Sequence, residues 1–191
     1  ALSVAVNRDA LVTDALGGYA VPAYGPVPPD LLGEVEITEP ENRTEEAARI
    51  LEEGGWSYDE TARTWKHEKE GLSLSVTLST ADVAELKATA EALRSDWEKL
   101  GVPTVIELYD SNDLVLSVIR PRDYEMLLFG MVVGRDKDFY AFWDSSQRND
   151  PGLNVSLYAN RAVDDLLEEI RSEEDPEALG TLLTELDAKI A

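Results

Sequence analysis

The clearest hydrophobic pattern in the chain spans residues 72–108, where a two-residue alternation gives way to a helical repeat and then to a second extended run. Residues 72–79 alternate leucine or valine with serine or threonine, which is typical of a β-strand. Residues 83–100 carry apolar side chains at three- and four-residue steps, which predicts an amphipathic helix ending at Gly101. Residues 103–108 are again rich in β-branched side chains. This order predicts a βαβ unit with parallel strands and a right-handed crossover.

Further helices are expected on both sides of this unit. The same helical spacing predicts helices at residues 2–16 and 43–53 and two terminal helices, one that carries Val163 to Ile170 and one that starts near Asp175 and carries Leu179 to Ile190. Residues 111–120 are either a short helix or an irregular crossover. Asn7 is suited to cap the second turn of the first helix and Asn42 to cap the helix at 43–53, because a short polar side chain can accept from the first free backbone N–H groups. The polar stretch 57–71 predicts an exposed hairpin, and residues 155–158 predict a short extended piece.

The stretch 124–143, YEMLLFGMVVGRDKDFYAFW, changes character in its middle. Residues 125–133 are almost continuously apolar, and this predicts a central strand that is buried on both faces. Glycine, charged and aromatic residues follow from Gly134 onward. Open α/β sheets bind ligands at the carboxyl ends of their strands, so we interpret this stretch as one wall of a binding cleft.

Four side chains after this strand combine an apolar surface with hydrogen-bonding groups: Tyr140, Trp143, Asn154 and Tyr158. Such a set suits a ligand with a peptide-like or sugar-like surface. Ordinary core packing is the alternative for the aromatic residues. We favour core packing for Phe139 and Phe142, and leave both interpretations open for Tyr140 and Trp143.

Composition and charge narrow the function further. A chain of 191 residues is long enough for one domain or for one lobe of a larger protein. Its net charge of −22 argues against a nucleic acid or an anionic membrane as partner, since both require a basic surface.

The chain lacks the residues that several kinds of chemistry require. The chain has one histidine and no cysteine, which argues against histidine-dependent nucleophilic catalysis and thiolate metal sites. It has no glycine-rich phosphate loop and no acidic cluster with EF-hand spacing. We therefore expect a protein that is not an enzyme and needs neither a metal nor a cofactor.

Several segments, in order, resemble a known family, the extracellular solute-binding proteins of the peptide, oligopeptide and nickel type that serve ABC importers. The segments that carry the resemblance are ALSVAVNRDALV (1–12), VPAYGPVPP (21–29), AARILEEGGW (47–56), residues 93–105, YEMLLFGMVVGRDKDFYAFWDSSQ (124–147) and GLNVSLYANRAVDDLLEEI (152–170). No single motif is specific, but their order and spacing together are.

The resemblance implies an α/β fold with a mixed, mostly parallel sheet flanked by helices, like the C-terminal lobe of a type II periplasmic-binding-protein fold. Residues 1–191 would then form a single lobe, with the N-terminal lobe absent. The implied protein is a monomer at the extracellular face of the membrane or in the periplasm, anchored through an upstream segment. It would bind a peptide or another small solute and deliver it to an ABC permease.

The resemblance also implies a ligand-binding segment, made of Gly130, Met131, Val132, Val133, Gly134 and Arg135. Peptide binders of this family commonly have tryptophan where this chain has Met131, and an aspartate that holds the peptide's amino terminus where it has Gly134. Asp136 or Asp138 would have to replace that aspartate. The alternative to a solute-binding lobe is a protein–protein interaction domain that uses the same scaffold with its acidic helices as the contact surface.

Overall fold

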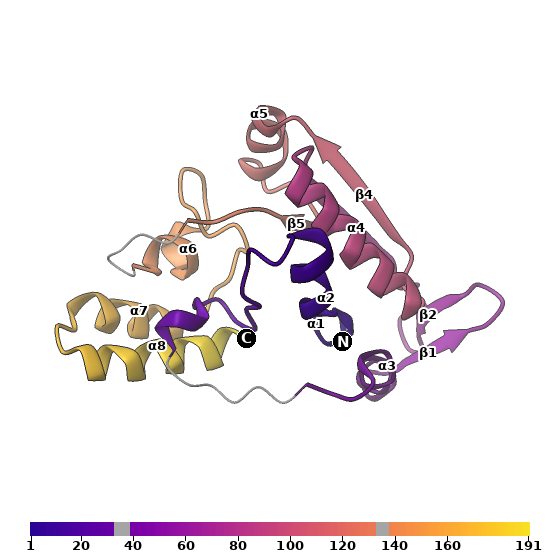
Figure 1. Cartoon of the computed structure of the whole chain (residues 1–191), viewed down its shortest axis with the longest axis horizontal. Helices are drawn as coiled ribbons and strands as arrows, with labels where there is room; N and C mark the ends of the chain where they lie inside the picture. Colours follow the sequence, from indigo (N-terminus) through magenta and orange to yellow (C-terminus); the bar gives the residue numbers. More distant parts are fainter. Residues whose placement is uncertain (33–38, 133–137) are drawn as a thin grey trace. The chain divides into compact units, whose positions relative to one another are not determined.

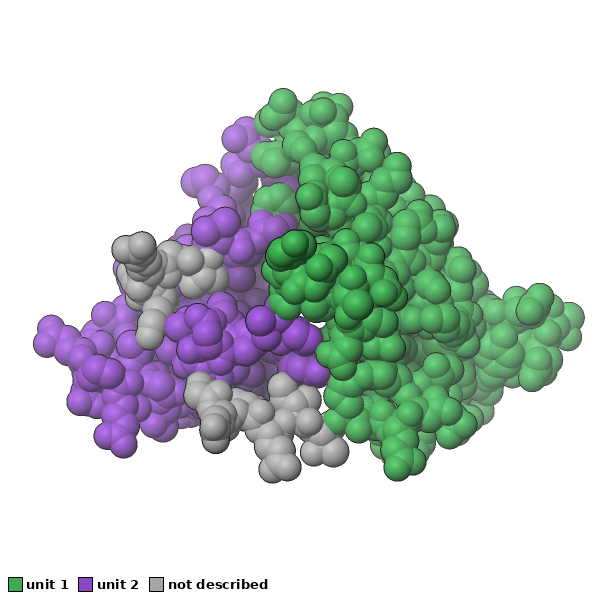
Figure 2. Space-filling view, viewed as in Figure 1, with its two compact units in different colours: residues 1–20, 37–118, 124–129 green, residues 21–36, 119–123, 130–191 purple. Residues whose placement is uncertain are grey.

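The computed structural model describes residues 1–32, 39–132 and 138–191. By contacts within the chain, these residues form two compact units, which are coloured separately in Figure 2. Unit 1 contains Ala1–Ala20, Ile37–Val118 and Tyr124–Phe129, and unit 2 contains Val21–Glu36, Ile119–Asp123 and Gly130–Ala191.

Unit 1 is built on a three-stranded parallel sheet with the order β4-β3-β5. Its strands are β3 (Val76–Ala81), β4 (Thr104–Tyr109) and β5 (Met126–Leu128). Helix α4 (Ala84–Lys99) connects β3 to β4 and lies along the sheet (Figure 1). The parallel β3-α4-β4 unit predicted from the hydrophobic pattern is therefore confirmed.

The remaining elements of unit 1 flank this sheet. They are α1 (Leu2–Ala5), α2 (Arg8–Ala10), the π-helix η1 (Leu11–Ala15), α3 (Arg43–Glu53), the hairpin strands β1 (Trp56–Asp59) and β2 (Thr64–His67), α5 (Ser111–Asp113) and the π-helix η3 (Leu114–Ile119). The first predicted helix is interrupted after Ala5, and Asn7 then caps α2 through a bond from the Ala10 N–H at 3.1 Å.

The core of unit 1 lies between the sheet, α1, α3 and α4. Its buried side chains are Ala5, Val6, Ala47, Leu51, Trp65, Val76, Leu78, Ala90, Trp97, Leu100 and Val102. Both buried indoles also bond to distant backbone, since Trp65 Nε1 donates to Leu100 O at 2.7 Å and Trp97 Nε1 to Leu2 O at 3.1 Å. These bonds satisfy the polar edge of each ring inside an apolar core.

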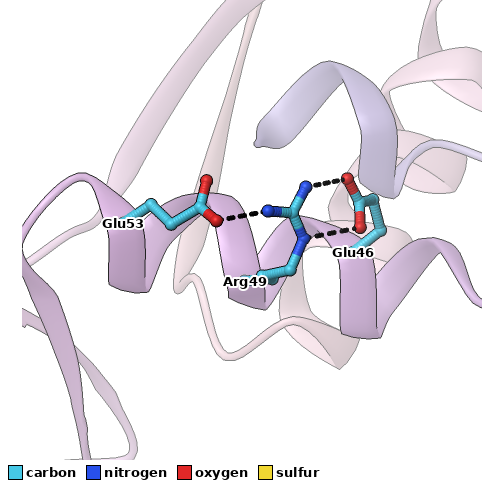
Figure 3. A network of polar contacts seen from close by, with 3 residues as sticks. All are labelled: Glu46, Arg49 and Glu53. Carbon is cyan, nitrogen blue, oxygen red and sulfur yellow. Dashed lines mark hydrogen bonds and ion pairs between the residues drawn. The ribbon is translucent and has the colours of Figure 1, made fainter.

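Helix α3 shows how the acidic surface is solvated. Arg49 lies between Glu46 and Glu53 on one exposed face of the helix (Figure 3), with its Nε 2.9 Å from Glu46 Oε2. The hydrogen bond from Arg49 lowers the pKa of the Glu46 carboxyl. Such exposed pairs contribute little to stability, so this cluster belongs to the solvated surface.

Two strand predictions are wrong in their placement. The central, buried strand is β3, whereas β5 contains only Met126–Leu128 and, among the described residues, pairs with β3 alone. The strand predicted at 72–79 begins only at Val76, and Leu72 is exposed. The alternating pattern indicated a strand here but not its central, buried place, because Ser79 and Thr80 are polar and yet buried. Their hydroxyls bond to Glu107 Oε2 at 3.3 Å and to Leu128 O at 2.9 Å.

Unit 2 is mainly helical and has its own core. It contains η2 (Pro29–Leu31), α6 (Tyr140–Trp143), η4 (Ser145–Gln147), α7 (Arg161–Ser172) and α8 (Pro176–Ile190). Helices α7 and α8 pack side by side, as Figure 1 shows in yellow. Their apolar faces meet around the buried side chains Val27, Phe139, Val163, Leu166, Leu167, Ile170, Leu183 and Leu186. Both terminal helices are thus confirmed, with Asn160 and Asp175 as their N-caps.

The proline-rich segment is part of unit 2, and one residue of α8 bonds to its backbone. The Val27 N–H donates to Asp187 Oδ1 at 3.0 Å, and a Cβ added at Gly25 would lie 2.2 Å from that same oxygen. A side chain at residue 25 would therefore push the Asp187 carboxylate away from its place beside the loop. The predicted extended piece at 155–158 is instead a turn, with Leu157 at a φ of 56°.

Candidate ligand-binding site

The predicted ligand-binding segment begins directly after β5. Gly130 is exposed, and so are the side chains of Met131 (42%) and Val132 (89%). Val133, Gly134 and Arg135 lie outside the described residues. The described part of the segment is therefore an apolar surface that follows the carboxyl end of an edge strand.

Phe139 anchors the chain at the start of α6. Its side chain is fully buried among the apolar residues of α7 and α8. The prediction of core packing is confirmed for this residue. The rings of Tyr140 and Trp143 are partly buried against the same core, which leaves part of each surface accessible.

Asn154 joins the aromatic residues through the backbone. It is 0% exposed, and its Nδ2 lies within hydrogen-bonding distance of the carbonyl oxygens of Trp143 (3.2 Å), Asp144 (3.0 Å) and Tyr158 (2.9 Å). Its Oδ1 accepts from Ser156 Oγ at 3.0 Å and from Tyr158 N at 3.1 Å. Both ends of the amide are engaged inside the protein, so Asn154 holds the site together from within.

Trp143 and Tyr158 form a T-shaped pair whose ring centroids are 6.0 Å apart. The Tyr158 hydroxyl donates to Lys189 O at 3.3 Å, which ties the pair to α8. Trp143 Nε1 is buried and has no hydrogen-bond partner among the described residues. A buried donor without a partner is costly, about 1–3 kcal/mol.

We expect Trp143→Phe to change the free energy of unfolding by no more than about 1 kcal/mol, because it removes the unpaired N–H while keeping an aromatic ring. Trp143→Ala removes the ring and should cost about 3 kcal/mol or more. Urea denaturation of both variants measures the difference. Equal losses for the two variants would show that the indole N–H has a partner after all.

Tyr140 is held by three neighbours within unit 2. Its backbone N–H donates to Asp138 Oδ1 at 3.0 Å, its hydroxyl lies 3.3 Å from Ser146 Oγ, and the guanidinium carbon of Arg171 lies 4.6 Å from the ring centroid. Asp138 Oδ2 is also 3.4 Å from Arg171 Nε. Of the two carboxylates that could replace the amino-terminus-binding aspartate, Asp138 is therefore already paired with Arg171, and Asp136 lies outside the described residues.

Two further residues shape the site and were not predicted. Arg122 donates to three backbone carbonyls, those of Ile119, Arg148 (3.2 Å) and Gly152 (2.8 Å). Asp164 of α7 accepts from Ser145 N at 2.8 Å and from Ser145 Oγ at 2.6 Å. Charged residues are so common in this chain that the sequence could not distinguish these two from solvated neighbours.

The structure brings together Trp143, Asn154 and Tyr158 by direct contacts, and connects Tyr140 to them through Ser146 and Asp144. Gly130, Met131 and Val132 belong to the same compact unit. No group of three or more metal-binding side chains occurs among the described residues. Within those same ranges, no helix is long and apolar enough to cross a membrane.

The parallel sheet flanked by helices, together with the helical core of unit 2, matches the fold of periplasmic binding proteins. The model of bacterial extracellular solute-binding proteins, family 5 (middle region), matches residues 1–151, and the chain belongs to that family. The description of the family is that of extracellular proteins that bind solutes, and one matched relative is named as an oligopeptide-binding protein.

The alignments with named relatives cover nearly the whole chain. Protein XP55 of Streptomyces lividans is 30% identical over 97% of this chain and 34% of its own length. The oligopeptide-binding protein AppA of Bacillus subtilis is 25% identical over 100% of this chain and 36% of its own length. The chain thus spans about a third of these relatives.

Solved structures show the same fold. The structure of Bacillus subtilis AppA in complex with a nonapeptide matches with a TM-score of 0.84 at 23% identity, covering 98% of this chain and 38% of that one. NikZ of Campylobacter jejuni in complex with Ni(L-His) matches with a TM-score of 0.78 at 20% identity, covering 99% and 38%.

Proposed function

We propose that residues 1–191 form one lobe of the substrate-binding component of an ABC importer, and that this component binds peptides without acting as an enzyme. The observation that carries the proposal is the family match over residues 1–151, supported by a peptide-binding relative that aligns with the whole chain. Residues 130–135 would form one wall of the cleft, and Tyr140, Trp143 and Tyr158 would lie beside it.

The chemistry of the described site favours a peptide over a metal complex. Met131 and Val132 offer exposed apolar contact, and the partly buried rings of Tyr140 and Tyr158 add flat surfaces with polar edges. Methionine and aromatic residues are common at adaptable binding surfaces, where they can contact ligand side chains of varied shape.

In solute-binding proteins of this kind, a hinged clamp closes on its ligand and presents it to the permease. If the two walls contribute about equally, micromolar binding by the complete protein, about −8 kcal/mol, would fall to about −4 kcal/mol for one wall, which is millimolar binding. Residues 1–191 alone would therefore bind only weakly.

We also propose that the complete protein acts as a monomer at the cell surface or in the periplasm, anchored by a segment upstream of this chain.

Isothermal titration calorimetry tests this proposal. The protein from the complete reading frame is titrated with peptides of two to nine residues and, separately, with nickel–histidine, and residues 1–191 are titrated in parallel. We expect micromolar or tighter binding of peptides by the complete protein only. Nanomolar binding by residues 1–191, or binding of nickel–histidine without peptides, would contradict the proposal. A stable protein partner recovered without added peptide would instead support the interaction-domain alternative.

A further inference from the structure

We propose that Arg171 is a positioning residue for ligand binding, which fixes the ring of Tyr140 and keeps Asp138 from acting as a ligand group. This inference rests on the proposed function, because it says that Arg171, which lies outside the cleft segment, sets the orientation of Tyr140 beside that segment. It concerns unit 2 alone, where all the contacts that carry it lie.

Arg171 makes two contacts that converge on Tyr140. Its guanidinium lies over one face of the Tyr140 ring, 4.6 Å from the centroid, and its Nε is 3.4 Å from Asp138 Oδ2. The other oxygen of Asp138 accepts from the Tyr140 backbone N–H. Arg171 therefore fixes the tyrosine twice, once through the ring and once through the carboxylate that caps its backbone.

These contacts leave the ring with a defined set of free surfaces. One face is occupied by the guanidinium, and the hydroxyl is 3.3 Å from Ser146 Oγ. The opposite face and edge remain for packing against the core and against a ligand. A guanidinium is suited to this role because its planar group can stack on a ring and bond to a carboxylate at the same time.

The site of Arg171 in the helix adds to the argument. Arg171 lies in the last turn of α7, where a positive charge interacts favourably with the helix dipole. The same helix begins with Arg161, whose side chain is 93% exposed and lies 4.0 Å from Asp165. Arg161 therefore offers a control of the same residue type on the same helix that touches none of the site residues.

The pairing of Asp138 has a consequence for specificity. At this carboxylate a peptide's terminal ammonium would have to compete with Arg171 at one oxygen and with the Tyr140 backbone N–H at the other. Recognition of the peptide's amino terminus should therefore not depend on Asp138. Loss of the carboxylate should weaken peptides with free and with blocked amino termini by the same factor.

The test measures dissociation constants of the complete protein for one peptide with a free and with an acetylated amino terminus. We expect Arg171→Gln and Asp138→Asn each to weaken both peptides about three- to tenfold, with the larger effect for Arg171→Gln because it also removes the ring contact. The double variant should be no weaker than Arg171→Gln alone, because the contact between Asp138 and Arg171 is already lost in that variant. Arg171→Lys, which keeps the charge but not the stacking plane, should restore only part of the loss, and Arg161→Gln should bind like the wild type.

A second measurement needs no ligand. Hydrogen exchange at the Tyr140 amide should be faster in Arg171→Gln and Asp138→Asn than in Arg161→Gln, because the acceptor of that amide either loses the partner that holds it in place or becomes a weaker, neutral oxygen. Wild-type binding together with wild-type exchange in Arg171→Gln would overturn the inference, as would an Asp138→Asn variant that weakens only the peptide with a free amino terminus. If the wild type binds no peptide, the proposed function fails, whereas the exchange rates still decide whether Arg171 fixes Tyr140.

Discussion

Replacing Phe139 by alanine should lower the free energy of unfolding by about 3–5 kcal/mol, the largest stability effect expected for a residue next to the site. The ring is 0% exposed and packs into the core that α7 and α8 form. Alanine would leave a cavity there, since helices on both sides are fixed by their own contacts. Urea denaturation followed by circular dichroism measures the loss.

Phe129→Ala serves as the control, because Phe129 is the same residue type but is 46% exposed. It should cost no more than about 1 kcal/mol. Phe139 is also adjacent to Tyr140, so the alanine variant should lose ligand affinity in proportion to its loss of order at α6. A Phe139→Ala variant as stable as Phe129→Ala would show that the ring does not contribute to the unit 2 core.

The helices were predictable from the sequence for a simple physical reason. Helices α4, α7 and α8 each bury one stripe of side chains, so their apolar residues recur with the period of the helix. Their ends were also predictable, because Asn160 and Asp175 are residues that cap helices through local bonds. Information of this kind is local and can be read from a few neighbouring residues.

The strands were less predictable, because burial in a sheet depends on partners far away in sequence. The apolar run at 125–133 suggested a central strand, yet only Met126–Leu128 pairs with β3. The true central strand contains Ser79 and Thr80, whose hydroxyls bond to Glu107 and to the Leu128 carbonyl, 28 and 48 residues away. Hydropathy cannot anticipate that such polar groups will be satisfied.

In the candidate site, too, local patterns were visible in the sequence and long-range contacts were not. The sequence identified Trp143, Asn154 and Tyr158, and the structure brings these three together. The sequence did not indicate that Asn154 turns inward or that Arg171 stacks on Tyr140, because both depend on how α7 packs against the loop before it. The sequence therefore indicated residues that lie close together, but not the direction in which each polar group acts.

Asn154→Ala should destabilise the protein by about 3 kcal/mol, although it removes only a small side chain. Its amide lies near three carbonyl oxygens and accepts from two donors, and the residue is fully buried. Removal leaves the Tyr158 N–H and the carbonyls of Trp143 and Asp144 without this partner. Each buried group left unpaired costs about 1–3 kcal/mol, and a water entering the space offsets part of that sum.

Two matched variants isolate the amide's contribution. Asn160→Ala removes an exposed cap that accepts only from the Ala162 N–H, and should cost about 1 kcal/mol. Asn154→Asp keeps the acceptor for Ser156 and Tyr158 but turns a carboxylate oxygen toward the carbonyls, so at neutral pH it should destabilise at least as much as alanine. An Asn154→Asp variant with wild-type stability would mean that donation to the carbonyls does not hold the loop. Because the amide fixes Trp143 and Tyr158 from behind, both Asn154 variants should also weaken ligand binding without the residue touching the ligand.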